Sequence, residues 1–172
     1  HQGVSYKREY FASYPHQAIF VRSVADQDGM INFDASLTSA HRSATVSTDG
    51  QEIVLKGQVE MGGIRFEGRV RVSITNGDLT IESNRIKVRN ADAATIMFVG
   101  ASSFVNYQDI SADPTKRAQD YAAALKGVDY EQAKQEHVND YQQLFKRMSL
   151  SFGTDPVDLS TDQRIKRFAN GM

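Results

Sequence analysis

The strongest constraint on the fold is the alternating run IRFEGRVRVSI at residues 64–74. Its apolar or small residues fall on every second position: Ile64, Phe66, Gly68, Val70, Val72 and Ile74. Because successive side chains of a strand point to opposite faces, this period of two predicts a β-strand with one apolar and one polar face. The run exceeds the roughly five or six residues that are usual, which indicates a central scaffold strand. We expect Phe66 and Val70 to point into a core and Arg69 to lie on a solvated face.

Strand patterns extend over residues 4–105. Residues 31–38 alternate in the same way, with Ile31 and Phe33 on one face. Residues 18–21 (AIFV) and 95–99 (TIMFV) are continuously apolar, or nearly so, which is typical of central strands covered on both faces.

Three short segments between these strands predict changes of chain direction. The Asn-Gly pair at 76–77 predicts a two-residue hairpin turn, because both central positions of such a turn need positive φ. The residues at 84–85 predict a second tight turn. The Gly-Gly pair at 62–63 predicts a bulge or bend before the long strand, since a phosphate-binding loop would need a helix after it.

After Phe104 the apolar residues recur at helical spacing, and we predict helices at 114–126, 129–147 and 161–169. Asp113 is suited to cap the first helix, and proline tolerates its first position. The second helix carries one long apolar face, made of Tyr130, Ala133, His137, Tyr141, Leu144, Phe145 and Met148. The third begins with a capping box of Ser160 and Gln163.

Strands followed by helices predict a mainly β fold, an antiparallel β-sandwich followed by a short helical linker. We place the sandwich at residues 1–110 and the helical linker at 111–172. The linker is too small for a core of its own, so it is expected to pack on the sandwich or on another domain.

Composition excludes several classes of protein. The net charge is -1 and the cationic residues are scattered, which disfavours nucleic acid as a partner. The sequence contains no run of eighteen apolar residues, so no segment is predicted to span a membrane. The absence of cysteine removes disulfides and thiolate chemistry and leaves the compartment open. The absence of tryptophan weakens the reading as a simple sugar-binding module.

The polar side of the long strand is the first place to look for a site. Arg65, Glu67, Arg69 and Arg71 could bind an acidic or hydroxylated ligand. We favour the alternative of a solvated sheet face, because mixed charges are typical of an ordinary sheet surface.

The four histidines form no ligand set. His137 lies on the apolar face of the second predicted helix with no second ligand at metal-binding spacing, so we expect it to be a packed, hydrogen-bonded histidine. His41 is expected on a loop, and His1 and His16 belong to no pattern. Asp26 and Asp28 form a turn, since the later ligands of a calcium loop are missing.

A polar cluster follows the strand at 95–99 and contains Ser102, Ser103, Asn106, Tyr107 and Asp109. Loops at strand ends often carry sites. No histidine base is near in sequence, so a serine nucleophile is unsupported. The sequence therefore assigns no catalytic, cofactor-binding or metal-ligating residue, and no cofactor.

Four segments together resemble glycoside hydrolase family 95, which includes α-L-fucosidases and some α-galactosidases: YKREYFASYPHQAIFVR (6–22), GGIRFEGRVRV (62–72), ADAATIMFVGASSFVNYQDISADP (91–114) and EHVNDYQQLFKRMSLSFG (136–153). They occur in the family's order and cover nearly the whole chain. The resemblance implies the N-terminal super-sandwich, entered part-way through, and the helical segments that lead to an (α/α)6 barrel. The family's acid and water-activating groups lie in that barrel, so none carries over to a residue here. The resemblance also implies a periplasmic or secreted parent.

These expectations lead to a non-catalytic accessory and linker region of a fucosidase-like hydrolase, whose partner is the barrel. The alternative is an autonomous carbohydrate-binding or interaction module, which exposed aromatics converging on one face would favour, among them Tyr6, Tyr10, Tyr14 and Tyr107. An independent small enzyme is the third. Open sheet edges and the apolar helix face also predict self-association.

Overall fold

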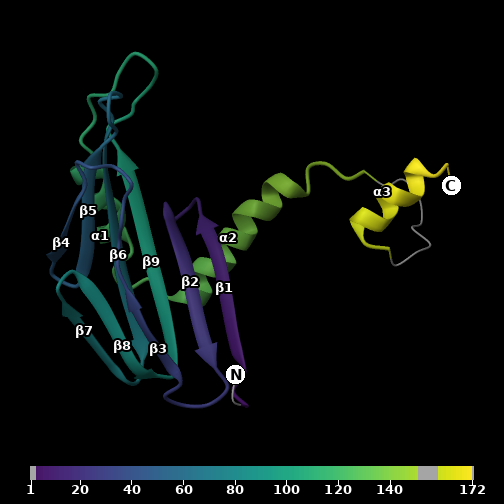
Figure 1. The fold of residues 1–172 in the computed structure, drawn as a ribbon, viewed down its shortest axis with the longest axis horizontal. Coiled ribbons are helices and arrows are strands. Elements are labelled where there is room, and N and C mark those ends of the chain that lie inside the picture. The colour runs from purple at the N-terminus through teal and green to yellow at the C-terminus, as the bar shows by residue number, and fades with distance from the viewer. Residues whose placement is uncertain (1–2, 151–158, 172) are drawn as a thin grey trace. The chain divides into compact units, whose positions relative to one another are not determined.

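A computed structural model describes residues 3–150 and 159–171 (Figure 1). They fall in two compact units that divide between Tyr141 and Gln142. The first unit holds all the strands, the first helix and most of the second. None of the helices in the described ranges has the length and hydropathy that a bilayer crossing requires.

The first unit is an antiparallel β-sandwich, as the sequence predicted. The larger sheet has six strands in the order β1 (Tyr6–Ser13), β2 (Ala18–Ala25), β9 (Ala93–Ser102), β6 (Arg65–Thr75), β5 (Glu52–Gln58) and β4 (Thr45–Asp49). The smaller sheet has three, in the order β3 (Ile31–Ala35), β8 (Arg85–Ala91) and β7 (Asp78–Glu82). The smaller sheet faces β5, β6 and β9.

The helices are α1 (Pro114–Ala124), α2 (Tyr130–Phe145) and α3 (Thr161–Ala169), close to the predicted spans. Asp113 caps α1 by accepting hydrogen bonds from the backbone N–H groups of Thr115 at 2.9 Å and Lys116 at 3.2 Å. After α1 the chain turns through Gly127, whose φ of 77° suits glycine. The helix ends were predictable because capping depends on residues close in sequence.

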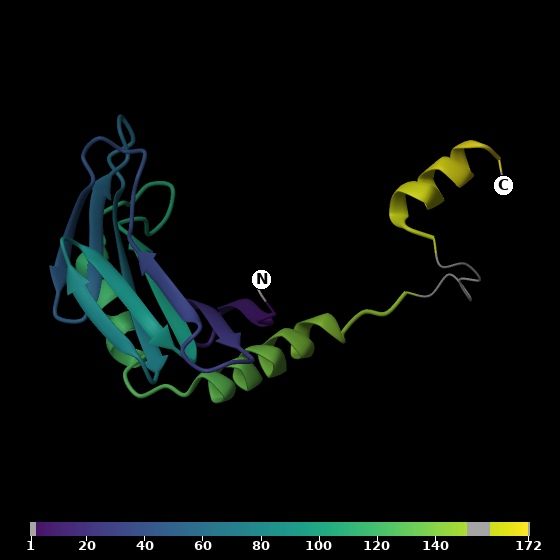
Figure 2. The ribbon, with the colours of Figure 1, turned by 60° about the horizontal axis from the view of Figure 1, so that its bottom comes forward.

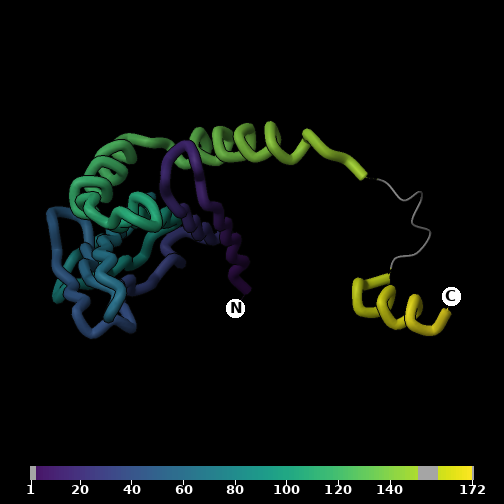
Figure 3. Tube along the Cα trace, turned by 90° about the horizontal axis from the view of Figure 1, so that it is seen from above, coloured from purple at the N-terminus to yellow at the C-terminus, as the bar shows by residue number. Residues whose placement is uncertain are grey.

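Two hydrophobic cores lie on opposite faces of the larger sheet. The inner core lies between the sheets and contains Ile53, Val70, Val72, Ile86 and Val88. The outer core lies between the larger sheet and the first two helices, and contains Phe20, Met97, Val99, Ala122, Leu125, Tyr130 and Ala133. Figures 2 and 3 show α1 and the start of α2 on one side of the larger sheet and the smaller sheet on the other.

The long strand β6 is central, as predicted, but its two faces differ from the prediction. Val70 is buried in the inner core. Phe66 is only half-buried, and its ring lies over Gly57 and near His41, with 5.4 Å between the ring centres of Phe66 and His41. We expected Phe66 to be buried in the core, and that expectation was wrong, because its side chain is only half-buried. Phe66 is the second residue of β6, and a hollow of about 270 Å³ beside it is lined by Leu55 and Phe98.

The predicted turns form, with two changes. Asn76 and Gly77 both have positive φ, at 54° and 75°, but they lead from β6 into β7 of the other sheet instead of closing a hairpin. A side chain at Gly77 would collide with the backbone of β8, 2.5 Å away. The second turn is centred on Ser83 and Asn84, one residue earlier than predicted. The glycine pair at 62–63 lies in the loop between β5 and β6.

The two predicted central strands, β2 and β9, both lie inside the larger sheet, but β2 is covered on one face only. Phe20 on the outer face is 1% exposed, whereas Ile19 on the inner face is 45% exposed. Tyr6 and Tyr10 of the neighbouring strand β1 share this inner face and are also exposed. The smaller sheet therefore leaves the inner face of β1 and much of β2 open.

Candidate functional site

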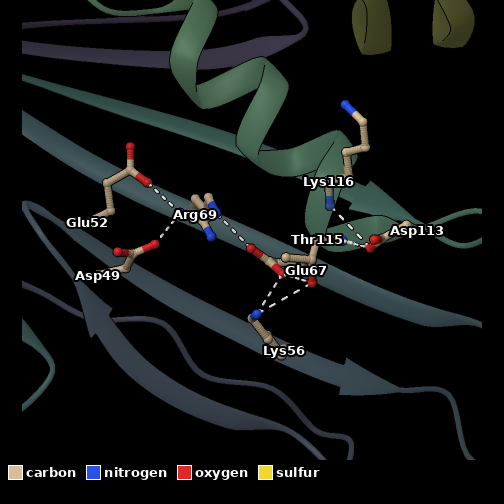
Figure 4. A network of polar contacts seen from close by, with 8 residues as sticks. All are labelled: Asp49, Glu52, Lys56, Glu67, Arg69, Asp113, Thr115 and Lys116. Carbon is tan, nitrogen blue, oxygen red and sulfur yellow. Dashed lines mark hydrogen bonds and ion pairs between the residues drawn. The ribbon is translucent and has the colours of Figure 1, made fainter.

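The strongest concentration of polar chemistry lies on the outer face of β6, where α1 covers it (Figure 4). Glu67 is 1% exposed and Arg69 is 5% exposed. The Glu67 carboxylate accepts a hydrogen bond from Arg69 Nε at 2.7 Å. The prediction of a solvated row was wrong for these two residues, because α1 lies over them.

Each end of this buried pair is held by further contacts. Arg69 Nη1 lies 2.9 Å from both Asp49 Oδ2, where β4 ends, and Glu52 Oε2, where β5 begins. Glu67 Oε2 accepts a hydrogen bond of 2.5 Å from the Thr115 hydroxyl in the first turn of α1 and lies 3.2 Å from Lys56 Nζ. The network therefore joins three neighbouring strands to α1.

The charges of the network stabilise one another. Burial disfavours the charged guanidinium of Arg69, but its hydrogen bonds to Glu52, Asp49 and Glu67 outweigh this effect and raise its pKa. A buried ion pair needs such additional hydrogen bonds to offset the loss of hydration. Glu67 and Arg69 thus use their hydrogen-bonding groups within the protein, which suits a structural role.

The other two members of the row also hold helical or loop backbone. Arg71 donates to the Leu125 carbonyl at the end of α1, at 3.0 Å, and Arg65 donates to the Ala112 carbonyl, at 3.2 Å. A cleft of about 450 Å³ lies beside Arg69 and Arg71, between the β4–β5 turn and α1. Its lining carries both signs of charge and no aromatic side chain.

The polar cluster after β9 is a folded loop with no nucleophile positioned for attack. Ser103 is fully buried, and its hydroxyl accepts a hydrogen bond from the Arg65 backbone N–H at 3.0 Å. Asn106 pairs with Asp109 across a short bridge, and hydrogen bonds from the Ser111 hydroxyl and from its backbone N–H lower the pKa of Asp109. Tyr107 extends into solvent.

α2 contacts the sandwich through aromatic rings and polar side chains. The Phe11 ring stacks on Phe20 at 4.9 Å and on His137 at 5.0 Å, measured between ring centres. Lys134 Nζ lies 2.5 Å from Glu9 Oε1, and this hydrogen bond lowers the pKa of Glu9. His137 therefore packs against the sandwich, as predicted.

We expect His137→Ala to lower the free energy of unfolding by about 1–3 kcal/mol, because it removes a ring that stacks on Phe11. Urea denaturation followed by circular dichroism measures this loss. His137→Phe is the matched control and should lose less, since it keeps a flat ring at the same place. Equimolar zinc bound by the wild type and lost from His137→Ala would contradict this packing role.

Sequence reasoning missed Asp49, Glu52, Lys56 and Thr115 of the network, and it also missed the contacts of His16. Its Nδ1 lies 2.9 Å from Ser13 Oγ, and its Nε2 lies 3.4 Å from Glu136 Oε2 on α2. This Ser-His-Glu order resembles a hydrolytic triad, but Ser13 is buried and its hydroxyl also faces the His16 backbone N–H at 3.4 Å. Only the spacing of Ser13 and His16 was visible in the sequence, because Glu136 is remote.

The remaining candidates do not form a common site. Asp26 lies at the turn after β2, where its side chain accepts from the Ser5 N–H at 2.9 Å. Tyr6 and Tyr10 share one face of β1, Tyr14 lies in the β1–β2 turn and Tyr107 lies in the loop after β9. Among residues 3–150 and 159–171, no three histidine or acidic side chains are grouped to hold a metal ion. His1 lies outside the described residues.

Comparison with known proteins agrees with this fold. The family described as glycosyl hydrolase family 65, N-terminal domain, matches residues 1–107, and the glycosyl hydrolase family 95 catalytic domain matches residues 129–172. A solved structure named as a kojibiose phosphorylase from human microbiome has a TM-score of 0.56 over 83% of this chain and 22% of that chain, at 6% identity. This likeness shows the fold alone.

A curated relative supports the same conclusion. The "Alpha-L-fucosidase 2" of Arabidopsis thaliana is 23% identical over 199 residues, which cover 96% of this chain and 24% of the relative. The chain thus spans about a quarter of that protein's length. Since the first family covers more than half of the chain, the chain belongs to the N-terminal domain family of glycosyl hydrolase family 65, and its residues 129–172 are similar to the start of a family 95 catalytic domain.

Proposed function

We propose that this chain is the non-catalytic sandwich and helical connection of a glycoside hydrolase that removes terminal fucosyl or galactosyl groups from glycans. The observation that carries the proposal is the order of the two family matches, a sandwich at residues 1–107 and a catalytic-domain segment at 129–172. The fucosidase relative supports the substrate class. The proposal includes the predicted boundary near residue 110 between the sandwich and the helical connection.

The role follows from how the helices are held. The Glu67–Arg69 pair and Thr115 fix the start of α1 on the sheet, and the Phe11–His137 stack fixes α2. Two independent attachments therefore hold α1 and the first part of α2 on the sandwich. The proposed function of the sandwich is therefore to anchor and orient the start of the catalytic domain.

We expect this chain alone to release no fucose or galactose from aryl α-glycosides. The buried carboxylate of Glu67 is engaged in an ion pair with Arg69, and the Ser13 hydroxyl is buried. A continuous chromogenic assay against a buffer blank measures this. Turnover that persists through repurification and disappears on a point mutation in this chain would overturn the proposal.

The alternative is that this chain is an autonomous carbohydrate-binding module. Isothermal titration calorimetry with fucosylated and galactosylated oligosaccharides distinguishes this alternative from the proposed function. The proposal expects no saturable heat. Saturable binding that Tyr10→Ala removes would favour the module instead.

A further inference from the structure

The cleft of about 450 Å³ beside Arg69 is lined by charged groups that come from two directions. Asp49 and Glu52 line it from the β4–β5 turn, whereas Arg71 and Lys126 line it near the end of α1. Figure 4 shows Asp49 and Glu52 directed toward Arg69. We propose that this cleft binds a sugar acid, which is a hydroxylated ring that carries one carboxylate, as in a hexuronic acid. This inference goes beyond the proposed function and does not depend on it.

The charges of the lining favour a ligand with a single negative charge. The charged residues of the lining are three cations and two carboxylates: Arg69, Arg71, Lys126, Asp49 and Glu52. The two carboxylates share Arg69 Nη1, at 2.9 Å each, and no carboxylate of the described residues pairs with Arg71 or Lys126. Glu67 leaves this balance unchanged, because it lies outside the lining and has Lys56 3.2 Å away. One positive charge is thus in excess. A monoanion would neutralise it, whereas a phosphate dianion would place a second negative charge beside two carboxylates.

Arg71 and Lys126 form the part of the cleft that suits a carboxylate. Arg71 Nη2 donates to the Leu125 carbonyl at 3.0 Å, which holds the guanidinium in place at the end of α1. Its other N–H groups bond to no described residue, so they can bind a ligand. Hydrogen bonds between a guanidinium and a carboxylate are about twice as strong as neutral ones. Lys126 follows Leu125 directly and adds a second positive charge on the same side.

The opposite part of the cleft suits hydroxyl groups. Arg69 binds one oxygen of each carboxylate, Asp49 Oδ2 and Glu52 Oε2. The other oxygen of each accepts no hydrogen bond from the described residues, so it can accept one from a ligand hydroxyl. Gln51 in the β4–β5 turn and Gln119 on α1 also line the cleft, and a side-chain amide both donates and accepts. A ring with several hydroxyls uses both kinds of group.

The cleft is large enough for one monosaccharide, since ligand pockets usually measure about 300–1,000 Å³. A neutral sugar would leave Arg71 and Lys126 without an anionic partner, and an acid without hydroxyls would leave Gln51 and Gln119 unused. The proposal therefore agrees with the expected absence of saturable heat from neutral fucosylated and galactosylated oligosaccharides.

Titration of the ¹⁵N-labelled chain, followed by heteronuclear NMR, tests the proposal with two matched probes. Methyl β-D-glucuronide carries the carboxylate, and methyl β-D-glucoside carries a hydroxymethyl group in its place. The glucuronide should shift the amide signals of Gly50, Gln51 and Lys126 in a saturable way. The glucoside should bind about tenfold more weakly or not at all, because it leaves the two cations unpaired.

Variants of the cleft locate the carboxylate. Lys126→Met should weaken glucuronide binding by about fivefold, because it removes an exposed cation that no described carboxylate pairs. Lys116→Met is the matched control, since Lys116 is an exposed lysine of α1 outside the lining, and it should bind like the wild type. Arg71→Met should weaken binding by about tenfold or more. Circular dichroism melts check that each variant is folded, and Lys126→Met keeps the test decisive if Arg71→Met is not.

Several outcomes would overturn the proposal. No saturable shift with the glucuronide, or equal binding of the two glycosides, excludes a site for a sugar acid. Equal affinities of Lys126→Met and Lys116→Met exclude the assigned position of the carboxylate. Acetate that binds as tightly as the glucuronide excludes the hydroxyl contacts, and inorganic phosphate that binds more tightly excludes the preference for a monoanion.

Discussion

Replacing Arg69 with alanine should lower the free energy of unfolding by about 3–5 kcal/mol, because it leaves the buried Glu67 carboxylate without its main partner. Asp49 and Glu52 would lose their shared cation as well. The sequence alone led to the opposite expectation of a mild effect. Urea denaturation followed by far-ultraviolet circular dichroism measures the change. This signal is suitable because the chain contains no tryptophan whose fluorescence could report unfolding.

Two further variants decide whether the buried charge is the cause. Arg65→Ala is the matched control, since Arg65 is an exposed arginine on the same face of the same strand, and it should lose less than about 1 kcal/mol. The double variant Glu67→Leu with Arg69→Met should recover much of the loss, because apolar residues of similar size often replace a buried ion pair at little cost. Equal losses in Arg69→Ala and Arg65→Ala would show that the network contributes little.

Phe20→Ala should also cost about 3–5 kcal/mol, since Phe20 is 1% exposed in the outer core. Its ring stacks on Phe11 and meets the edge of Tyr130, so the cavity would lie between the sheet and α2. Thermal and urea unfolding measure the loss. Phe66→Ala is the control, because its half-buried ring should cost about 1–2 kcal/mol. A larger loss at Phe66 would mean that the inner face contributes more to the core than the outer face.

Local features of this chain were predictable from sequence, and features that depend on distant segments were not. The cap at Asp113 was predicted because its partners, Thr115 and Lys116, are two and three residues away. The positive φ of Asn76 and Gly77 was predicted for the same reason. Which strand follows in space was not, since β7 joins the other sheet.

The candidate site shows the same division. Alternation in β6 identified two different faces and placed Val70 in a core. It could not show that Thr115, 48 positions later, would lie against Glu67 and bring the polar face under a helix. A mixed-charge row looks the same in sequence whether water or a helix covers it. His16 was missed because Glu136 lies on a helix near the other end of the chain.

The position of β9 has a consequence for the order of events during synthesis. β9 lies between β2 and β6 in the six-stranded sheet, and Arg22 on β2 donates a hydrogen bond to Thr95 on β9, 73 positions away in sequence. The β1–β2 hairpin therefore emerges from the ribosome long before the strand that holds it in the sheet. Until β9 and then α2 emerge, Phe11 and Phe20 lack the neighbouring strand and the helix that cover them, so the nascent hairpin is the segment for which a chaperone would compete.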